Sequence, residues 1–235
     1  MESVIGRAVT HDRIETRDQM IPKIIHQFWV GPKPPPMALI QTWRDAHPDW
    51  IHLLWTQELL DEAFPDGLYN QKHYDAMCEW NGKCDIARWE ILLHYGGFFL
   101  DADARCLAPL DDYLLANDSF SCYENELARP GLIAAGYVGA TQHNALMRLL
   151  VDELHAKDPA TLSSPGTLLA WETVGPSFLT AVVHTHRYSN LAVYPSFFFI
   201  PTHYTGLSYT GGAKVYADQL WGSTPNSGFE YASNT

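Results

Sequence analysis

The clearest pattern of hydrophobic and polar residues in this chain lies between residues 83 and 110, KCDIARWEILLHYGGFFLDADARCLAPL. Its first half carries apolar residues at three- and four-residue spacing, namely Ile86, Trp89 and Leu93. This spacing predicts an amphipathic helix over Cys84–Tyr95, and the glycine pair at 96–97 is typical of a helix end. The apolar run that follows predicts a buried strand over Phe98–Asp101.

Two aspartates, Asp101 and Asp103, stand at the end of this strand. If the strand geometry continues through them, both side chains project the same way while Ala102 points to the opposite face. Neighbouring carboxylates repel each other unless a cation or a shared proton lies between them. The pair therefore predicts a divalent cation held against phosphate oxygens, and all-oxygen ligands favour Mg²⁺ or Mn²⁺ over zinc.

Similar patterns predict alternating strands and helices along the rest of the chain. Further strands are expected at Ile21–Val30, Trp50–Trp55, Phe120–Tyr123 and Gly131–Ala140. Further helices are expected at Met37–His47, Gln57–Phe64, Pro109–Leu115, His143–Lys157 and Pro176–His186. Residues 66–82 are expected to be partly helical, and short strands and loops should follow residue 190. This alternation predicts an α/β sandwich, in which ligands gather at the carboxyl ends of strands.

The length and composition are consistent with one α/β domain at residues 21–235, preceded by a flexible tail at residues 1–20. Hydrophobic residues make up 46% of the 235 residues and charged residues 18%, which permits a large buried core. The net charge of -12 argues against a nucleic-acid-binding surface, which requires clustered Lys and Arg. An acidic protein that handles anionic substrates must concentrate positive charge locally, through a metal or a few basic side chains.

The cysteines and the apolar segments bear on the cellular compartment. The four cysteines, at positions 78, 84, 106 and 122, form no CxxC pair and have no histidine at zinc-finger spacing, so they are expected to be reduced and structural. No apolar stretch approaches the roughly 20 residues of a membrane span. The polar N-terminus lacks the core of a signal peptide, and we expect a cytoplasmic protein.

Several other residues are ambiguous when taken singly. Asp85 and Arg88 share a helix face, where a surface pair would contribute only a few tenths of a kcal/mol; Asp85 would also lie in the first turn of the predicted helix. Trp29 ends the first strand and could be a core residue or a platform for a nucleobase. Five scattered histidines are expected to be structural unless the fold brings them to a site: His26, His94, His184, His186 and His203. The signatures GxxxxGK[ST], GxGxxG, GxSxG and HExxH are absent.

Together, IPKIIHQFW and KCDIARWEILLHYGGFFLDADARCLAPLDDYL resemble the DXD-bearing glycosyltransferases of family 32. Weaker similarity extends to YENE (123–126), TVGPSFLT (173–180) and YADQLWGST (216–224), so that it spans most of residues 21–224. The family includes fungal initiating mannosyltransferases and bacterial capsule and lipopolysaccharide sugar transferases, with the clostridial glucosylating toxins more distant. The resemblance implies a Rossmann-like GT-A domain with a mixed, mainly parallel sheet flanked by helices, and a role in polysaccharide biosynthesis.

The resemblance also implies roles for individual residues. Trp29 would stack on the nucleobase, while Asp85 and Arg88 would contact the ribose and sugar of the donor. Asp101 would reach the ribose and sugar hydroxyls, and Asp103 would ligate the metal that clamps the diphosphate. Near the C-terminus, Ser223 would help complete the metal shell and Trp221 would help hold the donor. The chain departs from the family pattern at Cys84, at Ala135 and Gly136 (where an asparagine is expected), at Gln219 and Leu220 (histidine) and at Thr224 (tryptophan).

The expected activity is transfer of a hexose from a nucleotide sugar, UDP- in preference to GDP-, to a saccharide acceptor with retention of configuration. Asp101, Asp103 and Arg88 would be the catalytic residues, with Mn²⁺ or Mg²⁺ as cofactor and Arg88 as a fixed positive charge beside the leaving diphosphate. Whether retention uses a covalent intermediate or front-face attack stays open, as does the oligomeric state. Three carboxylates near the family blocks are candidate nucleophiles, Glu124, Glu126 and Glu172.

Two other interpretations remain open. A haloacid-dehalogenase-like phosphohydrolase also uses a strand that ends in DxD, but its nucleophile lies near the N-terminus and is followed by a lysine and an acidic pair. Here only Lys157 and Lys214 follow Asp101, without a GDxxxD motif. A non-catalytic carbohydrate- or nucleotide-sugar-binding module is consistent with the many Trp and Tyr residues and with the altered C-terminal block.

Overall fold

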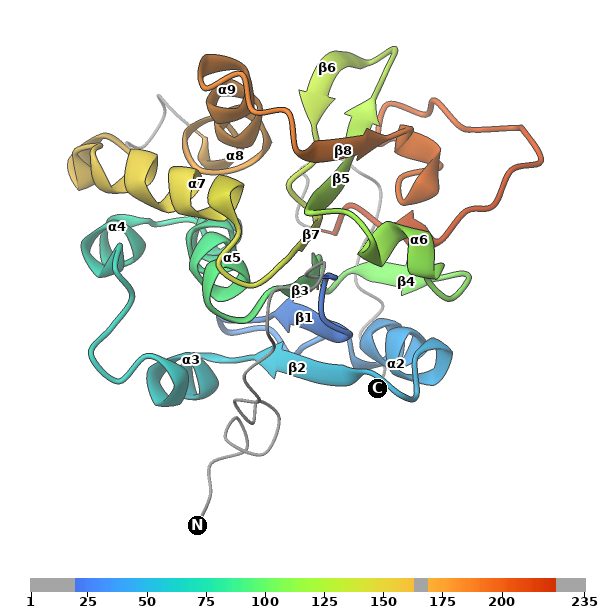
Figure 1. The fold of residues 1–235 in the computed structure, drawn as a ribbon. Helices are drawn as coiled ribbons and strands as arrows, with labels where there is room; N and C mark the ends of the chain where they lie inside the picture. The colour runs from blue at the N-terminus through green and yellow to red at the C-terminus, as the bar shows by residue number, and fades with distance from the viewer. Residues whose placement is uncertain (1–19, 163–168, 223–235) are drawn as a thin grey trace.

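A computed structural model describes residues 20–162 and 169–222 of the chain (Figure 1). Residues 1–19 of the predicted N-terminal tail lie outside the described residues, and so do Ser223 and Thr224. All four cysteines are free thiols, as expected. None of the described helices is long and apolar enough to cross a membrane.

A seven-stranded sheet with the order β2-β1-β3-β7-β5-β6, in which β8 also pairs with β5, forms the centre of the fold. Its strands are β1 (Ile24–Phe28), β2 (Ile51–Trp55), β3 (Gly97–Leu100), β5 (Ser119–Asn125), β6 (Arg129–Ile133), β7 (Tyr137–Ala140) and β8 (Leu191–Tyr194). β1 runs parallel to β2 and β3, and β8 runs parallel to β5. β7 is antiparallel to both β3 and β5, so β3 and β5 point the same way, and only β6 and β7 oppose the other strands. The predicted mixed, mainly parallel sheet is confirmed.

Helices cover both faces of this sheet (Figure 1). They are α2 (Met37–Ala46), α3 (Gln57–Ala63), α4 (Gln71–Ala76), α5 (Trp80–Tyr95), α6 (Asp112–Leu115), α7 (Ala145–His155), α8 (Ala170–Thr173) and α9 (Pro176–Thr185), with 3₁₀ turns η1 (Pro159–Thr161) and η2 (Ser196–Phe198). Alternation along β3 separates two cores: Phe99 packs with α5, α7 and α9, whereas Phe98 and Leu100 pack with α2 and α6. A second, two-stranded sheet pairs β4 (Ala104–Cys106) with β9 (Ala217–Gln219).

The helix predicted over Cys84–Tyr95 begins earlier, at Trp80, so the expectation that Asp85 lies in its first turn is wrong. Gly82 explains why the first turn was not recognised. A Cβ at this position would lie 2.8 Å from the Cβ of Ala170, so a polar, glycine-containing segment packs closely here. The predicted end of the helix is confirmed, since Gly96 caps it with a φ of 61°.

The single strand predicted over Gly131–Ala140 is also wrong, because the segment forms two strands. β6 pairs with β5, whereas β7 lies between β3 and β5, and residues 134–136 connect them outside any strand. Apolar residues occur in both halves, so the hydrophobic pattern did not reveal the break. The break places the backbone of residues 134–136 at the edge of the sheet where β3 and β5 end.

Candidate active site

A cavity of about 400 Å³ opens at this edge of the sheet. Because β1, β3 and β5 run in the same direction, their carboxyl ends meet there. Six of the seven predicted site residues line the cavity: Trp29, Asp85, Arg88, Asp101, Asp103 and Trp221. The seventh, Ser223, lies outside the described residues, so its predicted role stays a prediction.

The two aspartates lie in a turn and not on the strand. β3 ends at Leu100, and the turn is closed by a hydrogen bond of 3.1 Å from the Ala104 N–H to the Asp101 carbonyl. The prediction that the pair shares a face through strand alternation, with Ala102 opposite, is therefore wrong, and Ala102 lines the cavity as well. Both carboxylates still reach the cavity, but each has its own set of partners.

Asp101 is held by Arg88, which also binds Asp85. Arg88 Nη2 lies 2.6 Å from Asp101 Oδ1, and Nη1 lies 3.0 Å from Asp85 Oδ1. Nη1 also donates to the carbonyl of Ala135, in the break between β6 and β7. The Arg88 side chain is only 2% exposed, so the interpretation of Asp85 and Arg88 as an ordinary surface pair is wrong. Within the described residues, Arg88 Nε has no hydrogen-bond partner.

Burial governs the electrostatics of this cluster. It raises the pKa of Asp85 to about 7, with Arg88 acting in the opposite direction and Asp101 adding to the rise. Burial opposes the charge on Arg88, but the acidic neighbours raise the pKa of the guanidinium, which stays positively charged. Cys84, which replaces the small residue common in the family, lies 3.5 Å from Arg88 Nη2, and burial raises its pKa to about 12. Its thiol therefore stays neutral.

Asp103 is held by the C-terminal block. Gln219 Nε2 donates to Asp103 Oδ1 at 3.0 Å, and the backbone N–H of Gly222 donates to Oδ2 at 2.7 Å. The pairing of β4 with β9 places Gln219 here, and Tyr137 donates to the other end of the Gln219 amide at 2.6 Å. Burial, with Asp101 adding to its effect, raises the pKa of Asp103 to about 6 against these hydrogen bonds. Sequence reasoning noted Gln219 only as a departure from the family pattern.

The donor set at the turn fits a hard divalent cation. Nowhere in residues 20–162 and 169–222 do three or more His, Cys, Asp or Glu residues form a group that could hold a metal. Mg²⁺ and similar ions are, however, commonly held by one or two carboxylates together with water and substrate phosphates. A cation at Asp103 would also offset the cost of burying this carboxylate beside Asp101.

Aromatic side chains form the walls of the cavity. Trp29 follows β1, and its indole N–H donates to the carbonyl of Lys33 at 2.7 Å. Trp80 and Trp171 line the cavity as well, although sequence reasoning did not single them out. Trp221 donates to the Thr202 carbonyl at 3.0 Å and has a φ of 56°, an uncommon value for a bulky residue, immediately before the N–H that binds Asp103.

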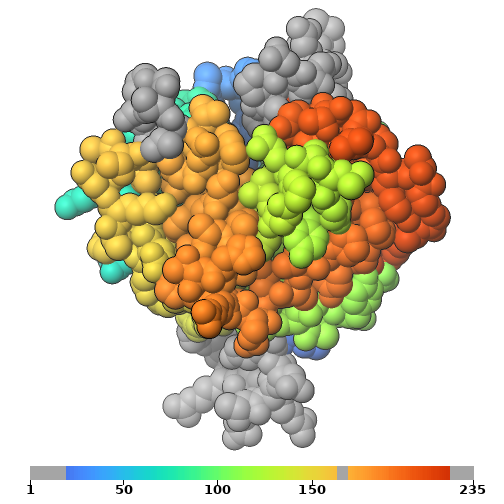
Figure 2. Space-filling view, turned by 90° about the horizontal axis from the view of Figure 1, so that it is seen from above, coloured from blue at the N-terminus to red at the C-terminus, as the bar shows by residue number. Residues whose placement is uncertain are grey.

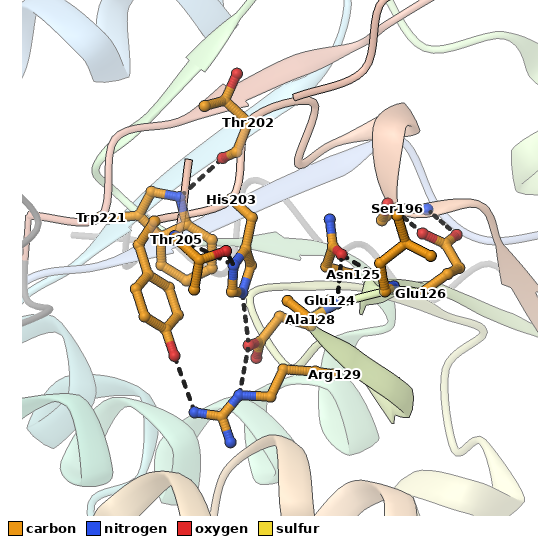
Figure 3. A network of polar contacts seen from close by, with 12 residues as sticks. Glu124, Asn125, Glu126, Ala128, Arg129, Ser196, Thr202, His203, Thr205 and Trp221 are labelled. Atoms are coloured by element: carbon orange, nitrogen blue, oxygen red, sulfur yellow. Dashed lines mark hydrogen bonds and ion pairs between the residues drawn. The ribbon is translucent and has the colours of Figure 1, made fainter. Parts of the chain in front are cut away.

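The three candidate nucleophiles are separated by the structure. Glu124 lines the cavity at the end of β5. Glu126 turns toward Ser196 and accepts hydrogen bonds from its N–H and hydroxyl at 2.8 and 2.6 Å (Figure 3). Glu172 accepts from the N–H of Leu169 at 3.2 Å, at the start of α8. Neither Glu126 nor Glu172 lines the cavity.

Comparison with known proteins finds similarity to glycosyltransferases. Residues 36–121 match the model of a family described as a glycosyltransferase sugar-binding region containing a DXD motif. Over 100 residues the chain is 34% identical to inositol phosphoceramide mannosyltransferase 2 of Schizosaccharomyces pombe, a match that covers 41% of this chain and 29% of that protein. It is 36% identical over 106 residues to mannosyl phosphorylinositol ceramide synthase CSH1 of Saccharomyces cerevisiae (43% and 27% covered).

A third relative is the initiation-specific alpha-1,6-mannosyltransferase of Candida albicans, which is 28% identical over 124 residues and matched over 48% of this chain and 32% of its own. The chain thus matches less than a third of the length of each of these fungal proteins. The matched family region contains Asp85, Arg88, Asp101 and Asp103, whereas Trp29, Glu124 and Gln219 lie outside it.

Solved structures show the same fold. The PaToxG glycosyltransferase aligns with a TM-score of 0.53 at 16% identity, over 72% of this chain and 70% of that one. The UDP-bound glycosyltransferase domain of the YGT toxin aligns with a TM-score of 0.52 at 10% identity, over 74% and 80%. The chain thus has a GT-A fold, and its residues 36–121 are similar to the sugar-binding region of DXD-containing glycosyltransferases, as the sequence resemblance predicted.

Proposed function

We propose that this protein transfers a hexose from a nucleotide sugar to a hydroxyl of a saccharide acceptor with retention of configuration, and that it requires Mn²⁺ or Mg²⁺. One observation carries the proposal. Six side chains that are expected to bind the donor or the metal, and that are spread along the sequence from Trp29 to Trp221, line a single cavity at the carboxyl edge of the sheet. Its volume of about 400 Å³ is within the range of small-molecule sites.

Trp29 and Trp221 would hold the donor from two sides of this cavity, with the nucleobase stacked on Trp29. Stacking of this kind contributes roughly 1–3 kcal/mol per base. UDP is the preferred nucleotide, in agreement with the UDP-bound toxin domain of the same fold, and GDP is the alternative. The names of the fungal relatives make mannose one of the hexoses to test.

Arg88 acts mainly by orienting Asp101. Two carboxylates and the Ala135 carbonyl occupy its guanidinium, which is almost fully buried, so its charge is largely balanced before any substrate arrives. Asp101 Oδ1 is thereby fixed, and Oδ2 is left to accept hydrogen bonds from hydroxyls of the ribose or the sugar. Asp85, which also lines the cavity, supports the same guanidinium through Nη1.

Asp103, with Ser223 as a further ligand, would hold the metal. The bound cation would neutralise the departing diphosphate as a Lewis acid. The hydrogen bonds from Gln219 and Gly222 fix both oxygens of Asp103 before the donor binds. Such preorganisation avoids reorganisation when charge develops on the leaving group.

A ligand screen followed by a turnover assay tests the proposal. UDP-glucose, UDP-galactose and GDP-mannose are each added with and without Mn²⁺, and the melting temperature is measured. A donor that raises it only with Mn²⁺ is then incubated with methyl α-glucoside, methyl α-galactoside or methyl α-mannoside, and the product is analysed by NMR for anomeric configuration. Binding without any donor turnover would instead indicate a non-catalytic module, and hydrolysis of para-nitrophenyl phosphate would indicate a phosphohydrolase.

A further inference from the structure

Glu124 lies in the same cavity as the two aspartates, near the carboxyl end of β5. In the sheet, Phe98 of β3 and Phe120 of β5 both pair with Gly139 of β7, so these two residues are level. Glu124 follows Phe120 by four residues on β5, whereas β3 ends two residues after Phe98, at Leu100, and turns into Asp101. β3 and β5 are two inter-strand steps, or about 10 Å, apart in the sheet.

This position is on the far side of the cavity from Trp29. The strand order runs from β1, which Trp29 follows, through β3 and β7 to β5. A donor with its base on Trp29 and its diphosphate at Asp103 would therefore direct its sugar toward β5. Glu124 lines the cavity and would then face that sugar, where a second substrate would approach it.

His203 fixes one oxygen of the Glu124 carboxylate. His203 Nδ1 accepts from the backbone N–H of Thr205 at 3.3 Å and lies 2.7 Å from the Thr205 hydroxyl, so Nε2 is the ring nitrogen that carries a proton toward Glu124. His203 Nε2 then donates to Glu124 Oε1 at 3.2 Å (Figure 3). The His203 side chain is completely buried, with its ring against Trp221 and Tyr204, so this donor is rigid.

Arg129 approaches the same oxygen, with its Nε 4.0 Å from Glu124 Oε1. Its Nη2 donates to the Tyr204 hydroxyl at 2.9 Å, and the guanidinium lies over the ring of Trp171, 4.9 Å from the ring centre. Figure 2 shows the hairpin that carries Arg129, in light green, between α8–α9 in orange and residues 200–219 in red. Arg129 thus bridges these two parts of the protein beside Glu124.

Both contacts use Oε1, and Glu124 Oε2 makes no hydrogen bond within the described residues. The side chain is 13% exposed. Glu124 contacts His203 and also lines the cavity, so its carboxylate can contact both His203 and a ligand. Here, one oxygen is fixed from behind by a buried ring, and the other is available to a ligand.

We propose that Glu124 is a catalytic residue whose Oε2 accepts the hydrogen bond of the attacking hydroxyl and takes its proton, with His203 as its positioning residue. This inference rests on the proposed function. The hydroxyl oxygen bonds to the anomeric carbon on the face from which the diphosphate leaves, so that the configuration is retained. As this bond forms, the bond from that carbon to the diphosphate oxygen breaks, and its electron pair leaves with the diphosphate. The hydroxyl proton passes to Glu124, and water serves as the attacking group when no saccharide is present.

Glu124→Gln tests the proposal, because the amide keeps an oxygen for His203 Nε2 but cannot take a proton. The turnover number for a Mn²⁺-dependent donor, measured in water and with a methyl glycoside, should fall about 100-fold, the usual contribution of a general base. The Kd for UDP with Mn²⁺ should change less than twofold. The matched control is Glu126→Gln, the same substitution two residues away on a side chain that faces Ser196, which should retain wild-type turnover.

His203→Gln should lower the turnover number about tenfold at an unchanged Kd for UDP, a split that a purely structural role would not give. Unchanged turnover in Glu124→Gln, or a parallel loss of UDP binding, would overturn the proposal. So would an inverted glycosyl azide formed by Glu124→Ala with azide, since it would identify Glu124 as a covalent nucleophile. A wild-type protein that neither binds nor turns over any donor would instead refute the underlying glycosyltransferase function.

Discussion

Arg88 Nη2 and Asp101 Oδ1 lie 2.6 Å apart, joining helix α5 to the turn that follows β3. The two residues are 13 positions apart in the sequence, and the helix end at Gly96 and Gly97 brings them together. A Cβ at Gly97 would lie 2.7 Å from the Ile24 carbonyl of β1, so only glycine permits this close entry into the sheet. The fold thereby places a fully charged guanidinium beneath the acidic turn.

Replacing Arg88 by methionine should destabilise the protein by about 3 kcal/mol, because buried Asp85 loses the cation that compensates it. The free energy of unfolding is measured by urea denaturation at pH 8. Asp85→Asn in the same background should restore more than half of the loss. Arg105→Met, at an exposed position of β4, is the control and should stay within about 0.5 kcal/mol of wild type. A loss of that small size for Arg88→Met would contradict the buried cluster.

Asp103→Asn should abolish Mn²⁺-dependent turnover and the Mn²⁺-dependent rise in melting temperature, while the protein remains folded. The asparagine amide nitrogen cannot accept a hydrogen bond, so the hydrogen bond from either Gln219 Nε2 or the Gly222 N–H is lost. The substitution also removes a buried carboxylate, whose pKa burial raises to about 6. The two effects oppose each other, so stability should change by no more than about 1 kcal/mol. Asp218→Asn, one residue before Gln219 and outside the cavity lining, is the control. An active, metal-responsive Asp103→Asn protein would contradict the assigned role.

Gly136→Ala should impair donor binding without unfolding the protein. An added Cβ would lie 2.6 Å from Asp101 Oδ2, so the carboxylate must move out of its position on Arg88. The carboxylate is the end of a side chain and can move, and the backbone at Gly136 does not need a positive φ. We expect a Kd for UDP with Mn²⁺ at least threefold higher, measured by calorimetric titration. Gly212→Ala, where no atom lies within 4 Å of the added Cβ, should bind as wild type does.

Acid should weaken the fold through His26. Burial lowers its pKa from 6.5 to about 4, although its hydrogen bond with the Gly96 carbonyl acts in the opposite direction. A lowered histidine pKa gives stability that is complete above pH 6.5 and is lost as the pH falls toward 4. Between pH 7 and 4.5, wild type should therefore lose about 2 kcal/mol more than His26→Gln. The free energy of unfolding is measured by denaturation at the two pH values, and equal losses in wild type and His26→Gln would contradict this prediction. The control is His184→Gln, at an exposed site, which should lose as much stability as wild type.

The longer elements could be predicted from the sequence because local signals define them. The helices expected from Met37 and Pro176 begin at those residues, and each ends within one or two residues of its predicted end. The pairing of β4 with β9 had no such signal, because each strand has three residues and they lie more than 100 positions apart. Helix α8 was missed because its four residues are too few to show a helical pattern of apolar positions.

The residues of the site were predicted better than its geometry. The resemblance and the DxD spacing identified Asp85, Arg88, Asp101 and Asp103, which meet in the cavity. The strand alternation assumed for the two aspartates was wrong, because the chain turns directly after Leu100. The contact between Glu124 and His203 spans 79 positions, and a single sequence holds no signal for such a pair.

The position of Asp103 depends on the small β4–β9 sheet, which has a low local stability. Asp103 receives both of its hydrogen bonds from residues 219 and 222, which three-residue strands attach to the domain. Short strands held by few hydrogen bonds detach at low free-energy cost, whereas the central strands open only on global unfolding. Detachment of β9 can therefore remove the two hydrogen bonds of Asp103 while the central sheet and its helices stay folded. In hydrogen exchange, the amides of residues 217–219 should lose protection well before those of residues 97–100.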